Sequence, residues 1–378
     1  MAVLTEEQSI LKDQAQSWVR DESSVTHFRA MRDAGHANGF DPATWQGVCN
    51  LGWSGILIPE EYGGSGMDFR TFGIVLEEAG RGLSASPLLA SALMGASALL
   101  LGGSSGQKKA YLPQIASGEL IVTLAVDETS QHNPSSIAFT ASQAGSGYTL
   151  SGTKYFVVEG AAADLLIVAA RTSGNAADDE GITLFAVDAS APGIHRQSLS
   201  TVDSRGYADI TFDAVAVDSS AVLGAVDQGR ELLDAVLDRG RAGLAAEMLG
   251  TGAEAFERTL EYLRTRVQFD QVIGSFQSLG HRQATHFMIM EFARSCVEAA
   301  LTAIDQDGED IAQLCSLAKC QVGDFLHDMT NDMIQMHGGI GMTDDFDAGF
   351  FLKRARTTEA LLGNRAFHKR RYISFSGI

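Results

Sequence analysis

The spacing of apolar positions changes twice along the chain, and this predicts three regions. Residues 1–120 follow a helical period broken by short loops, and the stretch TEEQSILKDQAQSWVR opens with a Thr suited to capping a helix. Residues 121–225 contain short β-branched runs such as IVTLAV and LLIVAAR, separated by Gly, Ser, Asn and Asp. This pattern predicts an antiparallel β domain of about seven strands.

From residue 226 the helical period returns and continues to the end of the chain. Positions such as Ala245, Leu249 and Phe256 recur at steps of three or four and form one apolar helix face. Long helices joined by short loops predict a four-helix bundle. The expected fold is mainly α with an inserted β domain: an N-terminal helical domain (1–120), a small antiparallel β domain (121–225) and a C-terminal helical bundle (226–378).

Composition narrows the function classes. The formal net charge of −19 disfavours nucleic-acid binding, because phosphates are repelled. The four Cys residues show neither CxxC nor zinc spacing, so we expect free thiols and no metal site. The chain has no apolar run long enough to span a membrane, and its N-terminus lacks a signal-peptide pattern, so we expect a cytoplasmic protein.

Four segments carry a resemblance to a known family. They are PEEYGG (59–64), GTKYFVVEGAAADLLIVAAR (152–171), RTRVQFDQVIGSFQSLGHRQA (264–284) and IQMHGGIGMT (334–343). In this order and spacing they resemble segments of acyl-CoA dehydrogenases. The chain is most similar to the small-subunit type, such as pimeloyl-CoA or steroid side-chain acyl-CoA dehydrogenase small subunits, which pair with a larger homologue.

The resemblance implies a flavoprotein that binds FAD and introduces an α,β double bond into an acyl-CoA thioester. FAD carries the redox chemistry, and the protein binds, orients and supplies the base. Electrons then pass to an electron-transferring flavoprotein. The resemblance also implies a homo- or heterotetramer. Small residues at 84–100 and Gly240 favour a wide pocket for a bulky, ring-derived or dicarboxylic acyl group.

The resemblance assigns FAD contacts to several positions. In the family, the Arg that matches Arg266 reaches the FAD pyrophosphate of a neighbouring subunit, a role that suits the two-pronged guanidinium. The alternative for Phe269 is plain core within an apolar helix stripe, and for the glycines a helix C-cap. Phe156 and Val158 fall where many relatives place Trp and Thr against the flavin. The implied cofactor-binding set is Arg266, Phe269, Gln277, Gln335, Gly338, Gly339, Phe156 and Val158.

Two segments match the family less closely. The loop VDETSQHNPSS (126–136) departs from the T-E-P-x-A-G-S-D pattern of many relatives, which leaves the pyrophosphate and thioester contacts open. DRGR (238–241) matches the start of a helix whose first residues meet CoA or the acyl chain, so Asp238 and Arg241 are the candidate substrate contacts. The alternative is a helix N-terminus capped by Asp.

The catalytic base is missing from both positions where the family places a Glu. Those positions hold Leu362 and Gly240 here. Three hypotheses remain open. A larger partner subunit supplies the base; a displaced carboxylate such as Glu359, Glu247 or Asp238 replaces it; or the chain is a catalytically degenerate structural subunit.

The reaction and the basic C-terminal run each admit a second interpretation. An acyl-CoA oxidase or a flavin-dependent desulfinase would use the same fold. The cations of the C-terminal run either meet FAD, CoA or an acidic partner or, for most of them, form a solvated helix face, which is the interpretation we favour. They are Arg354, Arg356, Arg365, Lys369, Arg370 and Arg371.

Overall fold

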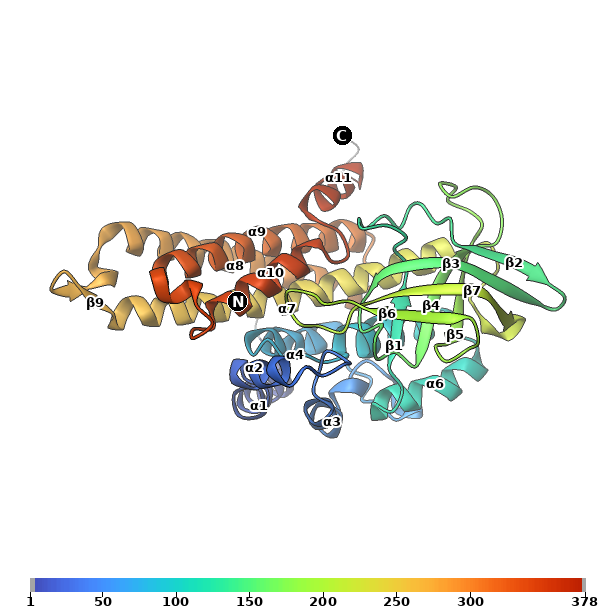
Figure 1. The fold of residues 1–378 in the computed structure, drawn as a ribbon, viewed down its shortest axis with the longest axis horizontal. Helices are drawn as coiled ribbons and strands as arrows, with labels where there is room; N and C mark the ends of the chain where they lie inside the picture. The colour runs from blue at the N-terminus through green and yellow to red at the C-terminus, as the bar shows by residue number, and fades with distance from the viewer. Residues whose placement is uncertain (1–3, 376–378) are drawn as a thin grey trace. The chain divides into compact units, whose positions relative to one another are not determined.

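The computed structural model describes residues 4–375, and these divide into two compact units that each combine distant segments (Figure 1). The helical unit contains the chain up to Ala30, Phe69–Ser84 and the chain from Arg241 onward. The sheet unit contains Met31–Asp68 and Ala85–Gly240. Two helices, α2 (Val25–Ala34) and α7 (Gly229–Thr265), run from one unit into the other.

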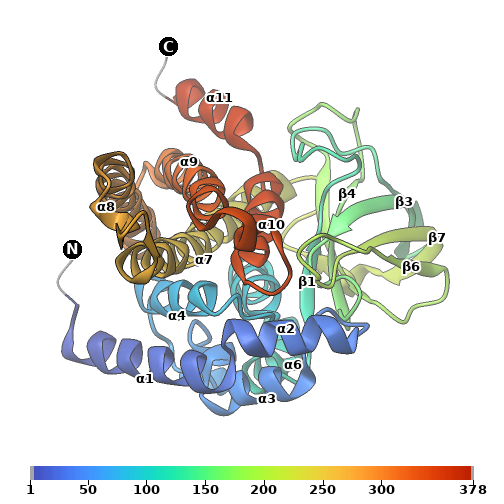
Figure 2. The ribbon, with the colours of Figure 1, turned by 60° about the vertical axis from the view of Figure 1, so that its left-hand side comes forward.

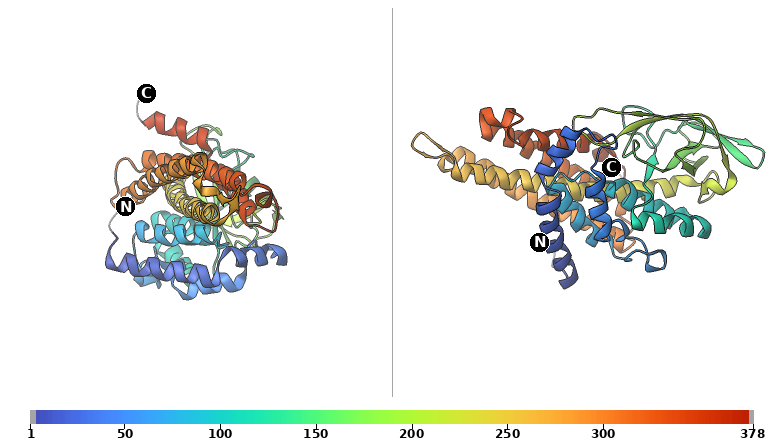
Figure 3. Two further views of the ribbon diagram at one scale, coloured as in Figure 1. Left: turned by 90° about the vertical axis from the view of Figure 1, so that its left-hand side faces the viewer. Right: turned by 60° about the horizontal axis from the view of Figure 1, so that its bottom comes forward.

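The helical unit is built around long helices. Its elements are α1 (Glu6–Glu22), α4 (Phe69–Arg81), most of α7, α8 (Gln277–Asp305), α9 (Ile311–His337), the 3-10 helix η6 (Gly338–Met342), α10 (Ala348–Ala360) and α11 (Arg365–Phe375). Figures 2 and 3 show α8 and α9 running side by side, and α10 and α11 both pack on α9. This arrangement confirms the predicted C-terminal bundle.

The first helix begins where the sequence predicts. The Thr5 hydroxyl accepts a hydrogen bond from the Gln8 N–H at 3.1 Å, and the Gln8 side chain accepts one from the Thr5 N–H at 3.2 Å. This reciprocal capping box satisfies two of the donors that every helix N-terminus leaves without an intrahelical partner.

The sheet unit holds an eight-stranded sheet in the order β6-β7-β3-β2-β4-β5-β8, with β1 beside β4. Most pairs are antiparallel, but β1 and β2 each pair with β4 in parallel, which corrects the expectation of a wholly antiparallel domain. The strands are β1 (Val122–Ala125), β2 (Thr140–Ala144), β3 (Gly147–Val157), β4 (Leu165–Arg171), β5 (Ile182–Asp188), β6 (Ile194–Ser198), β7 (Ala208–Asp218) and β8 (Val222–Leu223).

The core of the sheet unit contains aromatic and aliphatic side chains from several strands. The Phe139 and Phe212 rings meet edge to face with centroids 5.1 Å apart, next to buried Leu150 and Phe185. Shorter helices of the same unit are α3 (Pro42–Asn50), α5 (Ala96–Gly102), α6 (Ser105–Ser117), the π-helix η3 (Leu88–Gly95), and the 3-10 turns η1 (Trp53–Gly55), η2 (Glu60–Tyr62) and η4 (Ser219–Ala221).

A small β-hairpin, which the sequence pattern did not predict, joins α7 to α8. Strands β9 (Val267–Gln268) and β10 (Gln271–Val272) pair antiparallel and are followed by the 3-10 turn η5 (Ile273–Ser275). The turn residues Phe269 and Asp270 have φ of 55° and 64°. Positive φ at both central residues is the geometry of a two-residue hairpin turn, although neither residue is Gly.

Two local expectations are wrong. Phe269 does not lie in a helix stripe, because it stands at the hairpin tip with 85% of its surface exposed. Asp238 and Arg241 do not begin a helix, because α7 starts at Gly229 and continues through Gly240. An N-cap role for Asp238 is therefore excluded. A single glycine inside a helix costs only about 1 kcal/mol, which the packing of a long buried helix easily offsets.

The remaining sequence expectations concern the cysteines, membrane-spanning helices and metal sites. All four Cys residues are free. Among the residues that the structure describes, no helix is long and apolar enough to cross a membrane. The same residues contain no cluster of three or more His, Cys, Asp or Glu arranged to hold a metal ion.

Candidate active site

The loop between α10 and α11 contains the first position where a family Glu is expected. Leu362 occupies it, is buried, and has a φ of 56°. Gly363 follows with a φ of 111°. A branched aliphatic residue in the left-handed region is uncommon and persists only where its surroundings impose that conformation.

The second family position, Gly240, lies inside α7 and is buried. One residue further, Arg241 is fully buried, and its Nε donates to the Leu362 carbonyl at 3.2 Å. The Arg241 guanidinium also lies 5.3 Å from the centre of the Phe367 ring. Arg241 therefore joins α7 to the loop that carries Leu362. Asp238 is buried one turn earlier in the same helix.

Glu247, one of the candidate displaced bases, is committed to an ion pair. The Arg354 Nη2 lies 2.6 Å and its Nε 3.0 Å from Glu247 Oε1, and both side chains are about nine-tenths buried. A carboxylate that accepts two hydrogen bonds from one guanidinium already has a partner, and a role as base would require it to leave that pair. The interpretation of Arg354 as a solvated cation is wrong for the same reason.

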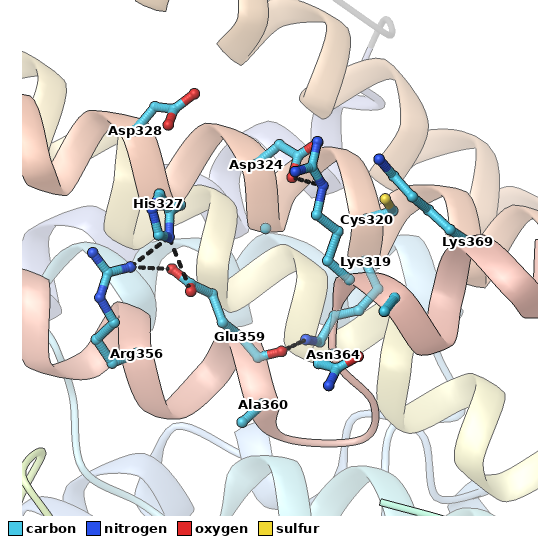
Figure 4. Close-up of a pocket in the computed structure, with 13 residues that line it drawn as sticks. Lys319, Cys320, Asp324, His327, Asp328, Arg356, Glu359, Ala360, Asn364 and Lys369 are labelled. Carbon is cyan, nitrogen blue, oxygen red and sulfur yellow. Dashed lines mark hydrogen bonds and ion pairs between the residues drawn. The ribbon is translucent and has the colours of Figure 1, made fainter.

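Glu359, the second candidate, faces a cavity of about 640 Å³ between α9, α10 and α11. Figure 4 shows its carboxylate directed at Arg356 and His327. Glu359 Oε1 lies 2.8 Å from Arg356 Nη1, and Oε2 lies 3.1 Å from His327 Nδ1. Both oxygens therefore have partners, and a role as base requires the carboxylate to leave them.

Lys319, on α9, is a functional candidate that the sequence pattern did not reveal. Its Nζ donates to the Thr358 carbonyl at 2.7 Å and lies 3.4 Å from the carbonyls of Glu359 and Gly363. Burial lowers the pKa of this amine to about 7. The available signal was a lone lysine among the mostly small and apolar buried positions of α9, which include Ala318 and Val322.

The hairpin between α7 and α8 presents the first group of expected FAD contacts. Arg266 follows α7 directly and is exposed, as Phe269 is at the tip. Gln277 begins α8 and is also exposed. Figure 1 shows the hairpin, labelled β9, at the end of the bundle where α7 and α8 meet. An exposed ring beside an exposed guanidinium suits a bound nucleotide.

The end of α9 presents the second group. Gly338 has a φ of 63° and a ψ of −137°, which only glycine adopts readily, and no heavy atom lies within 4 Å of a Cβ built on Gly338 or Gly339. Gln335, Gly338 and Gly339 are all exposed. The main chain here is uncovered, and this fits the close approach of a ligand.

His337 organises this end of the helix. Its Nδ1–H donates to the Met333 carbonyl at 2.7 Å, and its ring lies 4.2 Å from that of Tyr262 and 4.5 Å from that of Phe346. Burial lowers the pKa of His337, so the neutral imidazole is favoured. The contact with a carbonyl at the helix end agrees with a structural role.

In the sheet unit, Phe156 and Val158 lie at the end of β3 on unusual backbone. Phe156 and Glu159 both have a φ of 52°, and about half of the Phe156 surface is exposed. The Phe156 N–H donates to Asp209 Oδ1 at 3.0 Å, and the Val158 carbonyl accepts from the Thr123 hydroxyl. Strained residues of this kind are concentrated at ligand sites.

The divergent loop that follows β1 is held by its two carboxylates. Asp127 lies 2.9 Å from His132 Nδ1. Glu128 accepts from the N–H groups of Ala138 and Phe139 and from Lys154 Nζ at 2.7 Å. Burial lowers the pKa of Lys154 to about 8. The loop therefore has a defined internal structure despite its departure from the family pattern.

Family models match nearly the whole chain. Those of the N-terminal, middle and C-terminal domains of acyl-CoA dehydrogenase match residues 5–119, 125–215 and 227–374. The chain belongs to the acyl-CoA dehydrogenase family. Members of this family are FAD-dependent oxidoreductases that act on CH–CH bonds, which confirms the expected cofactor and enzyme class.

Individual relatives agree with this assignment. Mitochondrial isovaleryl-CoA dehydrogenase of Pongo abelii is 32% identical over 322 residues, covering 83% of this chain and 76% of the relative. A chain from the structure described as the electron transferring flavoprotein of Acidaminococcus fermentans superposes with a TM-score of 0.92 and 26% identity, covering 100% and 99% of the two chains. A chain of the ChsE4-ChsE5 complex from Mycobacterium tuberculosis superposes with a TM-score of 0.88 and 26% identity, covering 100% of this chain and 99% of that chain.

Proposed function

We propose that this chain is a subunit of an FAD-dependent acyl-CoA dehydrogenase whose catalytic base comes from a larger homologous subunit. The observation that carries the proposal is the state of the carboxylates near the expected positions. Leu362 and Gly240 replace the family Glu, Glu247 is paired with Arg354, and Glu359 is paired with Arg356 and His327.

The proposed reaction removes a proton from the α carbon and a hydride from the β carbon of an acyl-CoA thioester. Bound FAD supplies the acceptor for the hydride. The proposed contacts of this chain with the cofactor are Phe156 and Val158 in the sheet unit, and Arg266, Phe269, Gln277, Gln335, Gly338 and Gly339 in the helical unit. Asp238 and Arg241 remain the proposed substrate-side residues.

The heteromeric assembly is supported by a similar chain. The ChsE4-ChsE5 structure is a complex of two named components, and one of its chains superposes on this chain over its whole length. The proposed electron acceptor is an electron-transferring flavoprotein, in line with the name of the Acidaminococcus fermentans structure. A bulky or ring-derived acyl group is the proposed substrate.

The first experiment measures the FAD bound per chain, from the visible flavin spectrum, for the protein purified alone and co-expressed with a larger homologue. We expect little flavin alone and substantial flavin in the complex. The complex is then mixed anaerobically with straight-chain, dicarboxylic and ring-bearing acyl-CoA esters while flavin absorbance is followed. Bleaching by the ring-bearing esters supports the proposal.

Three different outcomes would overturn parts of the proposed function. About one FAD per chain together with full turnover of the chain alone would show that no partner supplies a base. Bleaching only by straight medium-length chains would refute the bulky substrate. Rapid oxygen consumption without an added electron acceptor would indicate an oxidase.

A further inference from the structure

The α10–α11 loop, defined here as residues 361–364, is fixed by two basic side chains that come from other helices. Lys319 of α9 reaches the carbonyls of Thr358, Glu359 and Gly363. Arg241 of α7 reaches the carbonyl of Leu362. Lys319 is 3% exposed and Arg241 is fully buried, so neither side chain belongs to the solvated surface.

The loop needs such partners because of where it lies in the chain. The last four carbonyls of any helix have no intrahelical donor, and α10 ends at Ala360. The Leu361 and Gly363 N–H groups bond back to Thr357 and Ala360, which closes the turn locally. The loop then passes through two residues with positive φ, Leu362 and Gly363. Local bonds alone do not impose a left-handed Leu, so contacts from outside the loop are required.

The main chain and the side chain of Glu359 have different partners. The Glu359 carbonyl faces the Lys319 amine, whereas its carboxylate points to Arg356 and His327 across the cavity (Figure 4). The loop and the end of α10 are therefore held on one side by Lys319 and on the other by an ion-pair network.

We infer that Lys319 is a positioning residue, whose bonds to three main-chain carbonyls set how residue 362 is presented. The inference rests on the family assignment behind the proposed function, because position 362 is one of the two places where the family carries its base. Lys319 does not touch the reacting atoms. It acts through the conformation of the α10–α11 loop.

The chemistry of Lys319 supports this role over that of an incidental buried lysine. Burying an amine in the protein interior costs free energy unless hydrogen bonds compensate. The hydrogen bonds of Lys319 Nζ all go to main-chain carbonyls at the end of α10 and in the loop that follows. Burial has the largest effect on the pKa of Lys319 and lowers it; Arg241 on α7 lowers it further, whereas Glu359 on α10 and Cys320 on α9 raise it.

The test combines Lys319→Met with a variant that installs a carboxylate, Leu362→Glu. The matched control is Lys353→Met, which makes the same substitution at an exposed lysine of α10. All variants are prepared as the FAD-loaded protein, with the larger subunit if the complex requires it. Two quantities are measured: hydrogen exchange of peptides covering residues 358–364, and the rate and substrate dependence of flavin reduction by acyl-CoA.

We expect Lys319→Met to increase amide exchange in 358–364 at least tenfold relative to peptides of α8, with FAD content unchanged. In a complex whose larger subunit has its own base replaced, Leu362→Glu is expected to speed flavin reduction by about 10²-fold or more, the usual contribution of a general base. In the double variant, most of that gain should be lost through kcat, with KM little changed. Lys353→Met should leave both quantities unchanged.

A second pair of variants keeps the test decisive if Lys319→Met does not fold. Lys319→Gln retains a shorter donor and should give an intermediate result. Gly363→Ala disturbs the loop while the Lys319 side chain is kept, because a Cβ there would collide with the Phe367 ring and the positive φ is strained for Ala. It should reproduce the increased exchange.

The inference is overturned if exchange in 358–364 rises no more than in α8, or if the gain from Leu362→Glu survives in the double variant. Absence of flavin reduction in every variant with every acyl-CoA would instead refute the proposed function. In that case the exchange measurement alone still decides whether Lys319 holds the loop.

Discussion

Among single residues, the contacts of Glu247 weigh against one of the candidate displaced bases. Sequence spacing places it near Gly240 on α7, where a carboxylate in an apolar pocket would act as a base. The structure instead pairs it with Arg354, which is 107 residues away in the chain. The carboxylate serves to neutralise a buried guanidinium.

This assignment predicts a stability effect for Glu247→Gln. Removing one partner of a buried pair leaves the other charge uncompensated and typically costs about 3–5 kcal/mol, so we expect the free energy of unfolding to fall by about 3 kcal/mol. Replacing both residues, as Glu247→Leu with Arg354→Met, should recover most of this loss. Denaturant titration followed by circular dichroism measures both.

The control for this measurement is Asp21→Asn, which breaks the exposed pair between Arg20 and Asp21 on α1. It should leave the unfolding midpoint unchanged, because exposed pairs are screened by solvent. If Glu247→Gln is as stable as the wild type but abolishes flavin reduction, Glu247 is the base and the pairing is dispensable.

Among the secondary-structure elements, α9 and the end of α10 are linked by Lys319, and this link should depend on pH. The pKa of Lys319 is lowered from 10.5 to about 7 by burial. Between these pH values the unfolded chain binds one more proton than the folded chain. The free energy of unfolding should therefore rise with pH across this window, by up to about 1.4 kcal/mol per pH unit.

The measurement is the unfolding free energy at intervals from pH 6.5 to pH 9, which samples the lower part of that window, compared between the wild type and Lys319→Met. Above about pH 7 the wild-type curve should be steeper than that of Lys319→Met, because only the wild type has the Lys319 amine. The Lys154 amine, whose pKa is about 8, is present in both proteins and adds the same slope to both curves. Lys353→Met should keep the wild-type slope. Parallel curves for the wild type and Lys319→Met would show that the amine does not titrate in this range.

In the molecule as a whole, the hairpin between α7 and α8 exposes several apolar side chains. Phe269 is 85% exposed, and Val267 and Val272 on its strands are 54% and 36% exposed. An exposed apolar patch of this kind, beside an exposed Arg266, indicates a binding surface more than a contribution to folding.

We therefore expect Arg266→Ala and Phe269→Ala to separate cofactor binding from stability. Each should lower the FAD retained after gel filtration at least tenfold, because a charge-assisted or stacking contact is lost. The thermal unfolding temperature of the flavin-free protein should not change. Ile10→Ala, at another exposed apolar residue on α1, serves as the control and should retain FAD.

Equal FAD retention in both hairpin variants would contradict the proposed contact. A large drop in the unfolding temperature of the flavin-free protein would instead show that the hairpin packs within the fold. Combining the two readouts distinguishes a ligand contact from a structural one.

The order and type of the main elements can be predicted from the amino-acid sequence. Helical spacing before residue 120 and after residue 226, with β-branched runs between them, reflects the different periods of helices and strands. Four motifs, together with this order, were enough to indicate the family. The absence of a Glu at positions 362 and 240 is also visible without any coordinates.

The roles of the remaining polar residues depend on the folded chain. The pairing of Glu247 with Arg354, and of Lys319 with the end of α10, joins residues far apart in the chain, and no periodicity encodes such contacts. The hairpin turn at Phe269 and Asp270 lacks the glycine that would have signalled it. The helical register of α7 through Gly240 depends on burial, which overrides the low helix propensity of a single glycine.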